Sequence, residues 1–136
     1  MKSTALRTAL RIAAVLFAVS LPLAAGAQEL AAGTVWVNEN NSAMTLTNVD
    51  PTTGLMTGTF VTGVGCGVGV VRPLTGFYNQ GAITMTVNFQ NCQSATSWTG
   101  QLSSTGNQIV TLWYLAVSGT PAWNSIIAGS DVFTRR

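Results

Sequence analysis

The sequence predicts an all-β domain, namely an eight-stranded antiparallel up-and-down β-barrel. Residues 34–134 form short segments in which apolar and polar residues alternate, which is the period of a half-buried strand. Clusters of Gly, Asn, Asp and Pro separate these segments, and most of the loops are short. Short loops favour consecutive antiparallel strands, and closing such a meander into a barrel removes its exposed edges.

The first three strands are expected at residues 34–38, 43–48 and 55–62. Thr, Val and large apolar residues dominate all three segments, as strands prefer. Pro51 and Gly54 lie between the second and third strands, where they supply the fixed and the positive φ angles of a turn. The Gly-rich residues 63–69 follow the third strand and should form a mobile loop unless Cys66 pins it.

The remaining strands are expected at residues 74–79, 82–90, 95–103, 108–116 and 126–134. Asn79-Gln80-Gly81 predicts a tight hairpin turn between the fourth and fifth strands. The fifth strand alternates most cleanly, with apolar side chains on one face at Ile83, Met85, Val87 and Phe89. A second turn, at residues 104–107, joins the sixth and seventh strands.

The seventh strand is apolar on both faces. Ile109, Trp113 and Leu115 share one face, and the other carries Val110, Leu112, Tyr114 and Ala116. One face can line the barrel interior, but the other has no partner inside a single domain of this size. This pattern predicts a homo-oligomer.

The first 27 residues are interpreted as a secretory signal peptide, which leaves residues 28–136 as the folded domain. Lys2, Arg7 and Arg11 are followed by a short apolar run and an A-x-A cleavage site that ends at Ala27. The apolar run is too short to span a membrane, which needs roughly 20 residues. We therefore expect a secreted protein, extracellular or periplasmic, with no membrane partner.

Removal of the signal peptide changes the charge of the chain. The full chain carries a net charge of +2. The mature part keeps three basic residues against four acidic ones: Arg72, Arg135 and Arg136 against Glu29, Glu39, Asp50 and Asp131. A basic surface for nucleic acid is therefore not expected, and no nucleic-acid partner is predicted.

Two cysteines, Cys66 and Cys92, lie in a chain bound for an oxidising compartment. A disulfide between them is favoured over two free thiols, and it would stabilise the fold by about 3.5 kcal/mol in the chain-entropy model. A metal site needs more ligands than these, and the chain has no histidine. No metal and no cofactor are expected.

The chain offers few groups for catalysis. It has no histidine, its one lysine lies in the signal peptide, and its acids are scattered. Among the acids, Asp131 alone is flanked by apolar positions in a predicted strand. The Gly-rich residues 63–69 lack the Lys and the following helix of a phosphate-binding loop. The residues therefore favour a binding protein over an enzyme.

Six stretches, in order and at near-family spacing, resemble the avidin and streptavidin family. They are Thr34-Val35-Trp36-Val37-Asn38 with Ser42, Leu55-Met56-Thr57-Gly58-Thr59-Phe60, Leu74-Thr75-Gly76, Ser94-Ala95-Thr96-Ser97-Trp98-Thr99-Gly100-Gln101, Trp113-Tyr114-Leu115 and Gly129-Ser130-Asp131-Val132-Phe133-Thr134. Each stretch alone is weak, but together they span essentially the whole mature chain. The resemblance implies an avidin-like barrel, the architecture known for streptavidin, with biotin as its ligand.

The resemblance also implies a role for each matching residue. Asn38 and Ser42 match donors to the ureido oxygen of biotin, while Thr62 and Asp131 match acceptors of its two N–H groups. Phe60 stands where the family has a third donor, a tyrosine, and losing one buried hydrogen bond costs about 1–3 kcal/mol. The remaining polar contacts are carried over to Thr96 near the sulfur, and near the carboxylate to Ser94 and the loop residues Val64, Gly65 and Gly67.

The aromatic walls of the family's site map to Phe89, Trp98, Trp113 and Trp123, beside Leu115. Phe89 replaces a tryptophan, and Trp123 matches the tryptophan that covers the ligand of a neighbouring subunit. The positions of Cys66 and Cys92 resemble the disulfide-bearing, rhizavidin-like bacterial avidins, in which the bridge holds a loop over the ligand. Those proteins are dimeric and lack the cross-subunit tryptophan, whereas this chain has Trp123 at the matching position. We therefore favour a homotetramer and keep a dimer as the alternative.

Two other functions stay open from the residues. A barrel of similar shape could hold another small apolar ligand, as lipocalin-like or inhibitor barrels do, but its pocket would have few convergent polar groups. A small secreted enzyme, such as a carbohydrate hydrolase, would need a second carboxylate placed near Asp131. The leading hypothesis is a secreted, non-enzymatic protein that sequesters biotin in the mouth of a β-barrel.

Overall fold

The computed structural model describes residues 29–119 and 121–136, so the signal peptide expected at residues 1–27 lies outside the described residues. Its elements are β1 Val35–Val37, β2 Ala43–Val49, β3 Leu55–Val61, β4 Val71–Asn79, β5 Ala82–Phe89, the 3₁₀ turn η1 Gln90–Cys92, β6 Ser94–Leu102, β7 Gln108–Val117, the 3₁₀ turn η2 Ala122–Ser125 and β8 Ile126–Arg135. Within the described part of the chain, no helix has the length and apolar character needed to cross a membrane.

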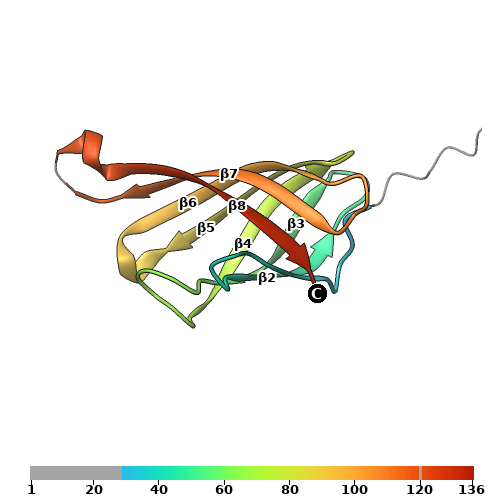
Figure 1. Cartoon of the computed structure of the whole chain (residues 1–136), viewed down its shortest axis with the longest axis horizontal. Helices are drawn as coiled ribbons and strands as arrows, with labels where there is room; N and C mark the ends of the chain where they lie inside the picture. The colour runs from blue at the N-terminus through green and yellow to red at the C-terminus, as the bar shows by residue number, and fades with distance from the viewer. Residues whose placement is uncertain (1–28, 120) are drawn as a thin grey trace, which may run out of the picture.

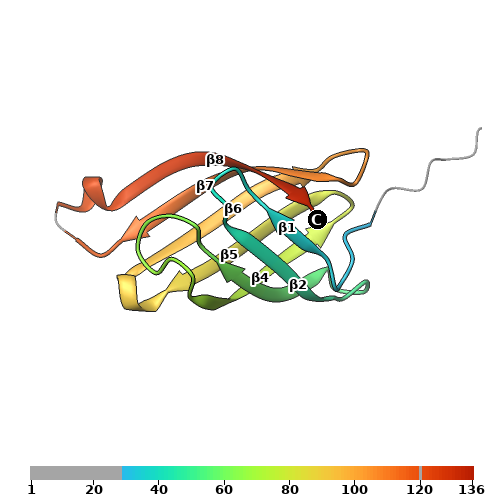
Figure 2. The ribbon, with the colours of Figure 1, turned by 60° about the horizontal axis from the view of Figure 1, so that its bottom comes forward.

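The eight strands form one closed barrel in chain order, and every neighbouring pair is antiparallel, which confirms the predicted fold class (Figure 1). Because the strands run alternately up and down, the loops β1–β2, β3–β4, β5–β6 and β7–β8 share one end of the barrel. Figure 2 shows the β3–β4 loop, η1 and η2 together at this end, which we call the mouth. The β2–β3, β4–β5 and β6–β7 turns lie at the other end.

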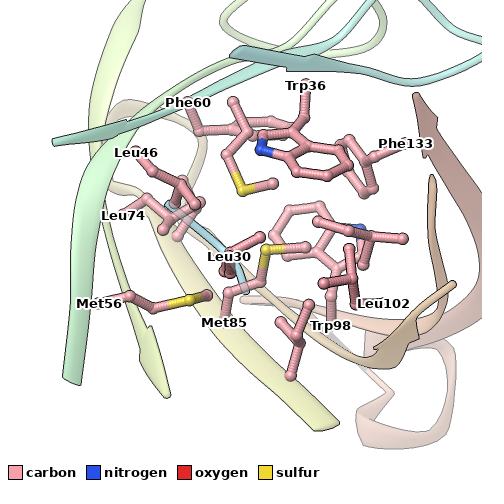
Figure 3. Close-up of a cluster of buried hydrophobic side chains, with 14 of the residues drawn as sticks. Leu30, Trp36, Leu46, Met56, Phe60, Leu74, Met85, Trp98, Leu102 and Phe133 are labelled. Atoms are coloured by element: carbon pink, nitrogen blue, oxygen red, sulfur yellow. The ribbon is translucent and has the colours of Figure 1, made fainter. Parts of the chain in front are cut away.

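The apolar residues that alternate along the strands point into the barrel and form its core. In β5 every second residue is buried, from Ile83 to Phe89. Trp36, Leu46, Met56 and Phe133 extend the same core from other strands, as Figure 3 shows. Burial of these side chains is the main stabilisation available to a domain with so few charges.

The far end of the barrel is closed by apolar side chains and local hydrogen bonds. Leu30, which precedes β1, is buried in the core. The indole N–H of Trp36 donates to Oγ1 of Thr34 at 2.9 Å, and that hydroxyl donates to the carbonyl of Ala31 at 2.7 Å. The buried indole therefore has a partner, and its chain of hydrogen bonds ties β1 to the segment before it.

The fourth strand begins at Val71, three residues earlier than the sequence predicts. Proline cannot donate to a strand ladder, so Pro73 is an unfavourable residue inside a strand. The structure accommodates it because residues 71–73 pair with β3 alone, while pairing with β5 begins at Leu74. The extra length brings Arg72 into the strand, facing Phe60 across the β3–β4 pair.

The outer face of the β7–β8 pair is apolar and exposed, as the pattern of the seventh strand predicts. Val110, Leu112 and Tyr114 of β7 are 53–63% exposed. On β8, Val132 pairs with Val110, and Ile126 pairs with Ala116. Both of these β8 residues are also exposed. A soluble single chain rarely presents so many large apolar side chains on one face.

Candidate ligand-binding site

The mouth of the barrel contains a pocket of about 330 Å³, within the size range of small-molecule sites. It is bounded by the β1–β2, β3–β4 and β5–β6 loops and by the inward faces of β3, β5, β6, β7 and β8. Its lining residues are Asn38, Asn40, Ser42, Phe60, Thr62, Val64, Gly65, Cys66, Phe89, Cys92, Ser94, Thr96, Trp98, Trp113, Leu115, Val117 and Asp131.

Asn38 and Ser42 form a buried polar pair whose hydrogen bonds leave donors unused. The backbone N–H groups of Asn40 and Ser42 donate to Oδ1 of Asn38 at 3.0 and 2.8 Å. The backbone N–H of Gly63 donates to Oγ of Ser42 at 3.0 Å. Oδ1 of Asn38 already accepts two backbone bonds and Oγ of Ser42 accepts one, so the donors that remain for a ligand are the amide NH₂ of Asn38 and the hydroxyl proton of Ser42.

Gly63 allows the β1–β2 and β3–β4 loops to approach closely enough for this arrangement. A Cβ atom built at Gly63 would clash with the backbone oxygen of Asn40. A side chain there would push the loops apart and withdraw the N–H group that orients the hydroxyl of Ser42. The glycine belongs to the supporting structure of the site, which sequence reasoning placed only in a flexible loop.

Asp131 and Trp98 join the strands on the opposite wall. Trp98 Nε1 donates to Oδ2 of Asp131 at 2.8 Å, and both side chains are buried. The hydroxyl of Thr111 donates to the backbone oxygen of Asp131 at 3.0 Å, which fixes β8 against β7. A carboxylate that accepts a buried N–H bond is held in one orientation, and its second oxygen remains an acceptor.

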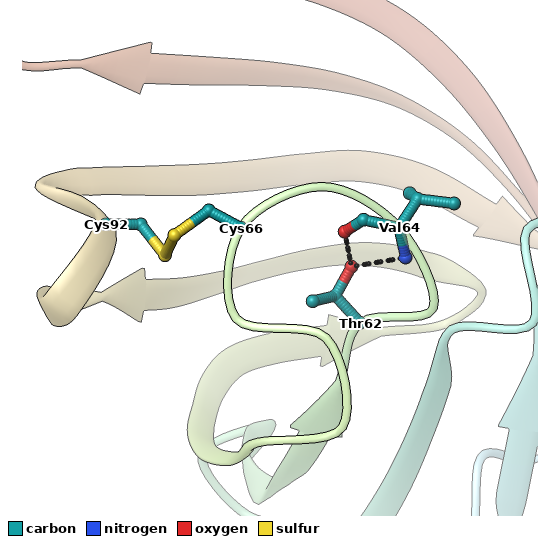
Figure 4. The surroundings of a disulfide bond; sticks show 4 residues. All are labelled: Thr62, Val64, Cys66 and Cys92. Carbon is teal, nitrogen blue, oxygen red and sulfur yellow. Dashed lines mark hydrogen bonds between the residues drawn. A yellow bond between two sulfur atoms is a disulfide. The ribbon is translucent and has the colours of Figure 1, made fainter.

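Thr62 lies at the start of the β3–β4 loop and holds that loop by two short bonds. Its Oγ1 donates to the carbonyl of Val64 at 2.7 Å and accepts from the Val64 N–H at 3.2 Å. Figure 4 shows these bonds beside the disulfide between Cys66 and Cys92, which links the loop to η1. The expected disulfide is therefore present, and Cys66 pins the Gly-rich loop.

Aromatic side chains form the apolar walls of the pocket. The ring of Phe60 lies 5.1 Å from that of Trp98 and 6.1 Å from that of Phe89, measured between centroids. Trp113 lies across the β7–β8 pair from Gly129, and a Cβ atom built at Gly129 would clash with its indole. The glycine thus lets the indole lie flat against β8.

Almost all residues predicted to contact a ligand line this one pocket. Gly67 does not line it, and a Cβ atom built at Gly67 would meet the guanidinium of Arg72 and Sγ of Cys92 instead. Trp123 lies in η2, and its side chain is outside the described part of the structure. Sequence reasoning missed Asn40 and Val117. The two-residue period of β7, continued past Leu115, would have found Val117.

Glu39 is a further residue of the mouth that the sequence did not identify. β1 pairs with β8 at only two positions, Trp36–Arg135 and Val37–Thr134. Beyond them, the carboxylate Oε2 of Glu39 accepts the backbone N–H of Val132 at 3.0 Å. A side chain therefore continues the barrel closure where the strand β1 has ended, next to Asp131.

Over the described residues, no group of His, Cys, Asp or Glu side chains is arranged to hold a metal ion.

Comparison with known proteins assigns this architecture to a family. A model of the Avidin family matches residues 26–136. Afifavidin from Afifella pfennigii is 39% identical over 108 residues, which cover 73% of this chain and 65% of afifavidin. The chain thus spans just under two thirds of the length of that relative.

Two solved structures share the fold over their whole length. Apo shwanavidin superposes with a TM-score of 0.72 at 30% identity and covers 79% of this chain and 100% of its own. A rhizavidin–biotin complex superposes with a TM-score of 0.68 at 33% identity, with 77% and 100% covered. With the barrel, the pocket and the family match in agreement, this chain belongs to the Avidin family.

Proposed function

We propose that this chain is a secreted protein that binds biotin non-covalently in the pocket at the barrel mouth and thereby sequesters it. Members of the Avidin family bind biotin and are not enzymes, which agrees with the scattered acids and absent histidines of this sequence. The observation that carries the proposal is the hydrogen-bonding state of the four polar side chains Asn38, Ser42, Thr62 and Asp131.

These four side chains complement a cyclic urea. A ureido group has one carbonyl oxygen, which accepts, and two N–H groups, which donate. Asn38 and Ser42 each have a donor left for the carbonyl oxygen, because their own oxygens already accept backbone N–H groups. Thr62 gives its proton to Val64, and Asp131 uses Oδ2 for Trp98, so each offers one acceptor to a ligand N–H.

The rest of the pocket suits the remainder of biotin. Phe60, Phe89, Trp98 and Trp113 form apolar and aromatic walls for the fused rings and the aliphatic chain. Ser94 and the loop residues Val64 and Gly65 stand nearer the opening, where a carboxylate would emerge. This polar pole inside an aromatic pocket argues against the alternative, a barrel for a purely apolar ligand.

The test is calorimetric titration of the mature protein with biotin, with Asp131→Asn as the variant. A hydrogen bond to a charged group is worth about 1.5–3 kcal/mol, so the variant should bind biotin roughly 10- to 150-fold more weakly. Asp50→Asn is the matched control, because Asp50 undergoes the same chemical change in an exposed turn at the other end of the barrel. Equal affinities in the two variants, or no heat of biotin binding in the wild type, would refute the proposal.

We further propose that the chain forms a homo-oligomer through the outer face of β7 and β8, with a tetramer favoured over a dimer. The exposed side chains of Val110, Leu112 and Tyr114 support an interface between copies of the chain. Leu112→Lys should dissociate the assembly in analytical ultracentrifugation. Thr75→Lys is the control, because it adds the same charge to an exposed polar position on β4, across the barrel from β8, and should leave the assembly intact. A monomeric wild type would contradict this.

Secretion is proposed from residues 1–27, whose basic start, apolar run and A-x-A site are typical of a cleaved signal peptide. Expression of the whole chain in a bacterium with a secretory pathway should release a product that begins near Gln28. Intact mass of the product reads out the cleavage. A full-length product retained in the cytoplasm would contradict secretion.

A further inference from the structure

A positively charged side chain is buried inside the barrel near its mouth. Arg72 lies on β4, is 6% exposed and pairs with Phe60 of β3 across the ladder. Charged residues are seldom so buried unless a partner of opposite charge accompanies them. The surroundings of Arg72 therefore bear on what the site binds.

The guanidinium of Arg72 lies between a wall of the pocket and the β3–β4 loop. Its Cζ atom stands 5.2 Å from the ring centroid of Phe89, a stacking distance for a cation on an aromatic face. A Cβ atom built at Gly67 would lie 2.8 Å from Nη2 of Arg72 and 3.4 Å from Sγ of Cys92. The charge thus sits directly beneath the disulfide-linked loop.

The carboxylates of the described chain are engaged away from Arg72. Asp131 accepts from Trp98, and Glu39 accepts from Val132. Glu29 and Asp50 both line a hollow at the opposite end of the barrel. Among the described residues, Nε of Arg72 has no hydrogen-bond partner. Over residues 29–119 and 121–136, no carboxylate is therefore paired with the buried guanidinium.

The buried charge lies at the end of the pocket where the tail of a ligand would emerge. Phe89, Cys92 and Ser94 line the pocket there. Arg72 does not line the pocket itself, but its guanidinium contacts the ring of Phe89. Arg72 therefore acts on a ligand through its electric field across the ring of Phe89, and such a field is weakly screened inside a protein.

We propose that Arg72 makes the site selective for ligands that carry a negative charge at the mouth, so that biotin with a free carboxylate binds more tightly than its neutral ester or a cationic amine analogue. The inference rests on the proposed biotin binding and adds a residue that sets its preference. Arg72 is a positioning and specificity residue, because its charge attracts the ligand without direct contact.

The test compares the affinities of one protein for three probes, namely biotin, biotin methyl ester and an amine-terminated biotin analogue. The wild type should bind them in that order, with about a tenfold step between biotin and the ester. In Arg72→Gln the ratio of the ester and acid dissociation constants should fall toward one. Arg72→Lys should keep most of the preference, because it keeps the charge. Arg135→Gln is the matched control, since it removes the same charge at an exposed position near Trp36.

The ratio separates charge recognition from structural damage, which would weaken acid and ester equally. If Arg72→Gln does not fold, the wild type still decides, because an amine analogue that binds as tightly as the ester would overturn the proposal. An unchanged ratio in a folded Arg72→Gln would also overturn it. Absence of any biotin binding by the wild type would instead refute the proposed function.

Discussion

The disulfide between Cys66 and Cys92 gives the prediction whose size is best defined. The change is the double variant Cys66→Ser/Cys92→Ser. The two cysteines are 26 positions apart in the chain. In the chain-entropy model, closing a loop of that length lowers the entropy of the unfolded chain and raises the free energy of unfolding by about 3.5 kcal/mol. For a domain of about 100 residues this corresponds to a fall in Tm of roughly 15 °C.

The assay is thermal unfolding of the ligand-free protein followed by tryptophan fluorescence. A reducing agent should lower the Tm of the wild type to that of the double variant, and it should leave the variant unchanged, which serves as the control. Biotin should also leave the variant faster, because the loop that carries Val64 and Cys66 is no longer tied to η1. A variant that melts within about 3 °C of the wild type would refute the entropic reasoning.

Three further predictions concern single side chains. Phe60→Tyr should tighten biotin binding about 5- to 150-fold if its hydroxyl completes the donors to the ureido oxygen. Isothermal titration that finds no gain would show that two donors suffice. Glu39→Ala should weaken barrel closure at Val132 and lower the Tm by several degrees. Glu39→Gln keeps an acceptor, so its Tm should stay close to that of the wild type. Equal falls in Tm for the two variants would exclude this hydrogen bond as the cause. The backbone N–H groups of Thr52 and Thr53 hold the pKa of Asp50 below its ordinary value, so its contribution to stability is present at neutral pH and is lost as the pH falls through the lowered pKa. Asp50→Ala should accordingly lower the Tm at pH 7 but not at about pH 2, and a pH-independent difference would contradict this assignment.

Much of the fold follows from local patterns in the sequence. The two-residue alternation of β5 and the turn residues between segments predict the strands and their antiparallel order, because each depends on residues close together in the chain. The strand expected at residues 74–79 is three residues shorter than β4, which begins at Val71 and includes Pro73. Pro73 is tolerated because this part of β4 pairs with β3 and not with β5. Which strands pair at a given position is decided by the closed barrel and not by the local sequence.

The site was predictable to the extent that family motifs carry it. Asn38, Ser42 and Asp131 were expected together from their resemblance to the family's site, and the structure brings them to one pocket. The hydrogen bonds that leave their donors and acceptors free could not be predicted, because they come from the backbone of other loops, such as the N–H of Gly63. Arg72 was not identified from the sequence, because residues 70–73 lie between the loop expected at 63–69 and the strand expected at 74–79.

The most direct test of the central claim is native mass spectrometry of the mature secreted protein titrated with biotin. It reports the number of chains in the assembly and the number of ligands bound in the same spectrum. The account predicts an assembly of two or four chains that saturates at one biotin per chain. A folded protein that shows no mass increase of one biotin per chain at saturating ligand would contradict it.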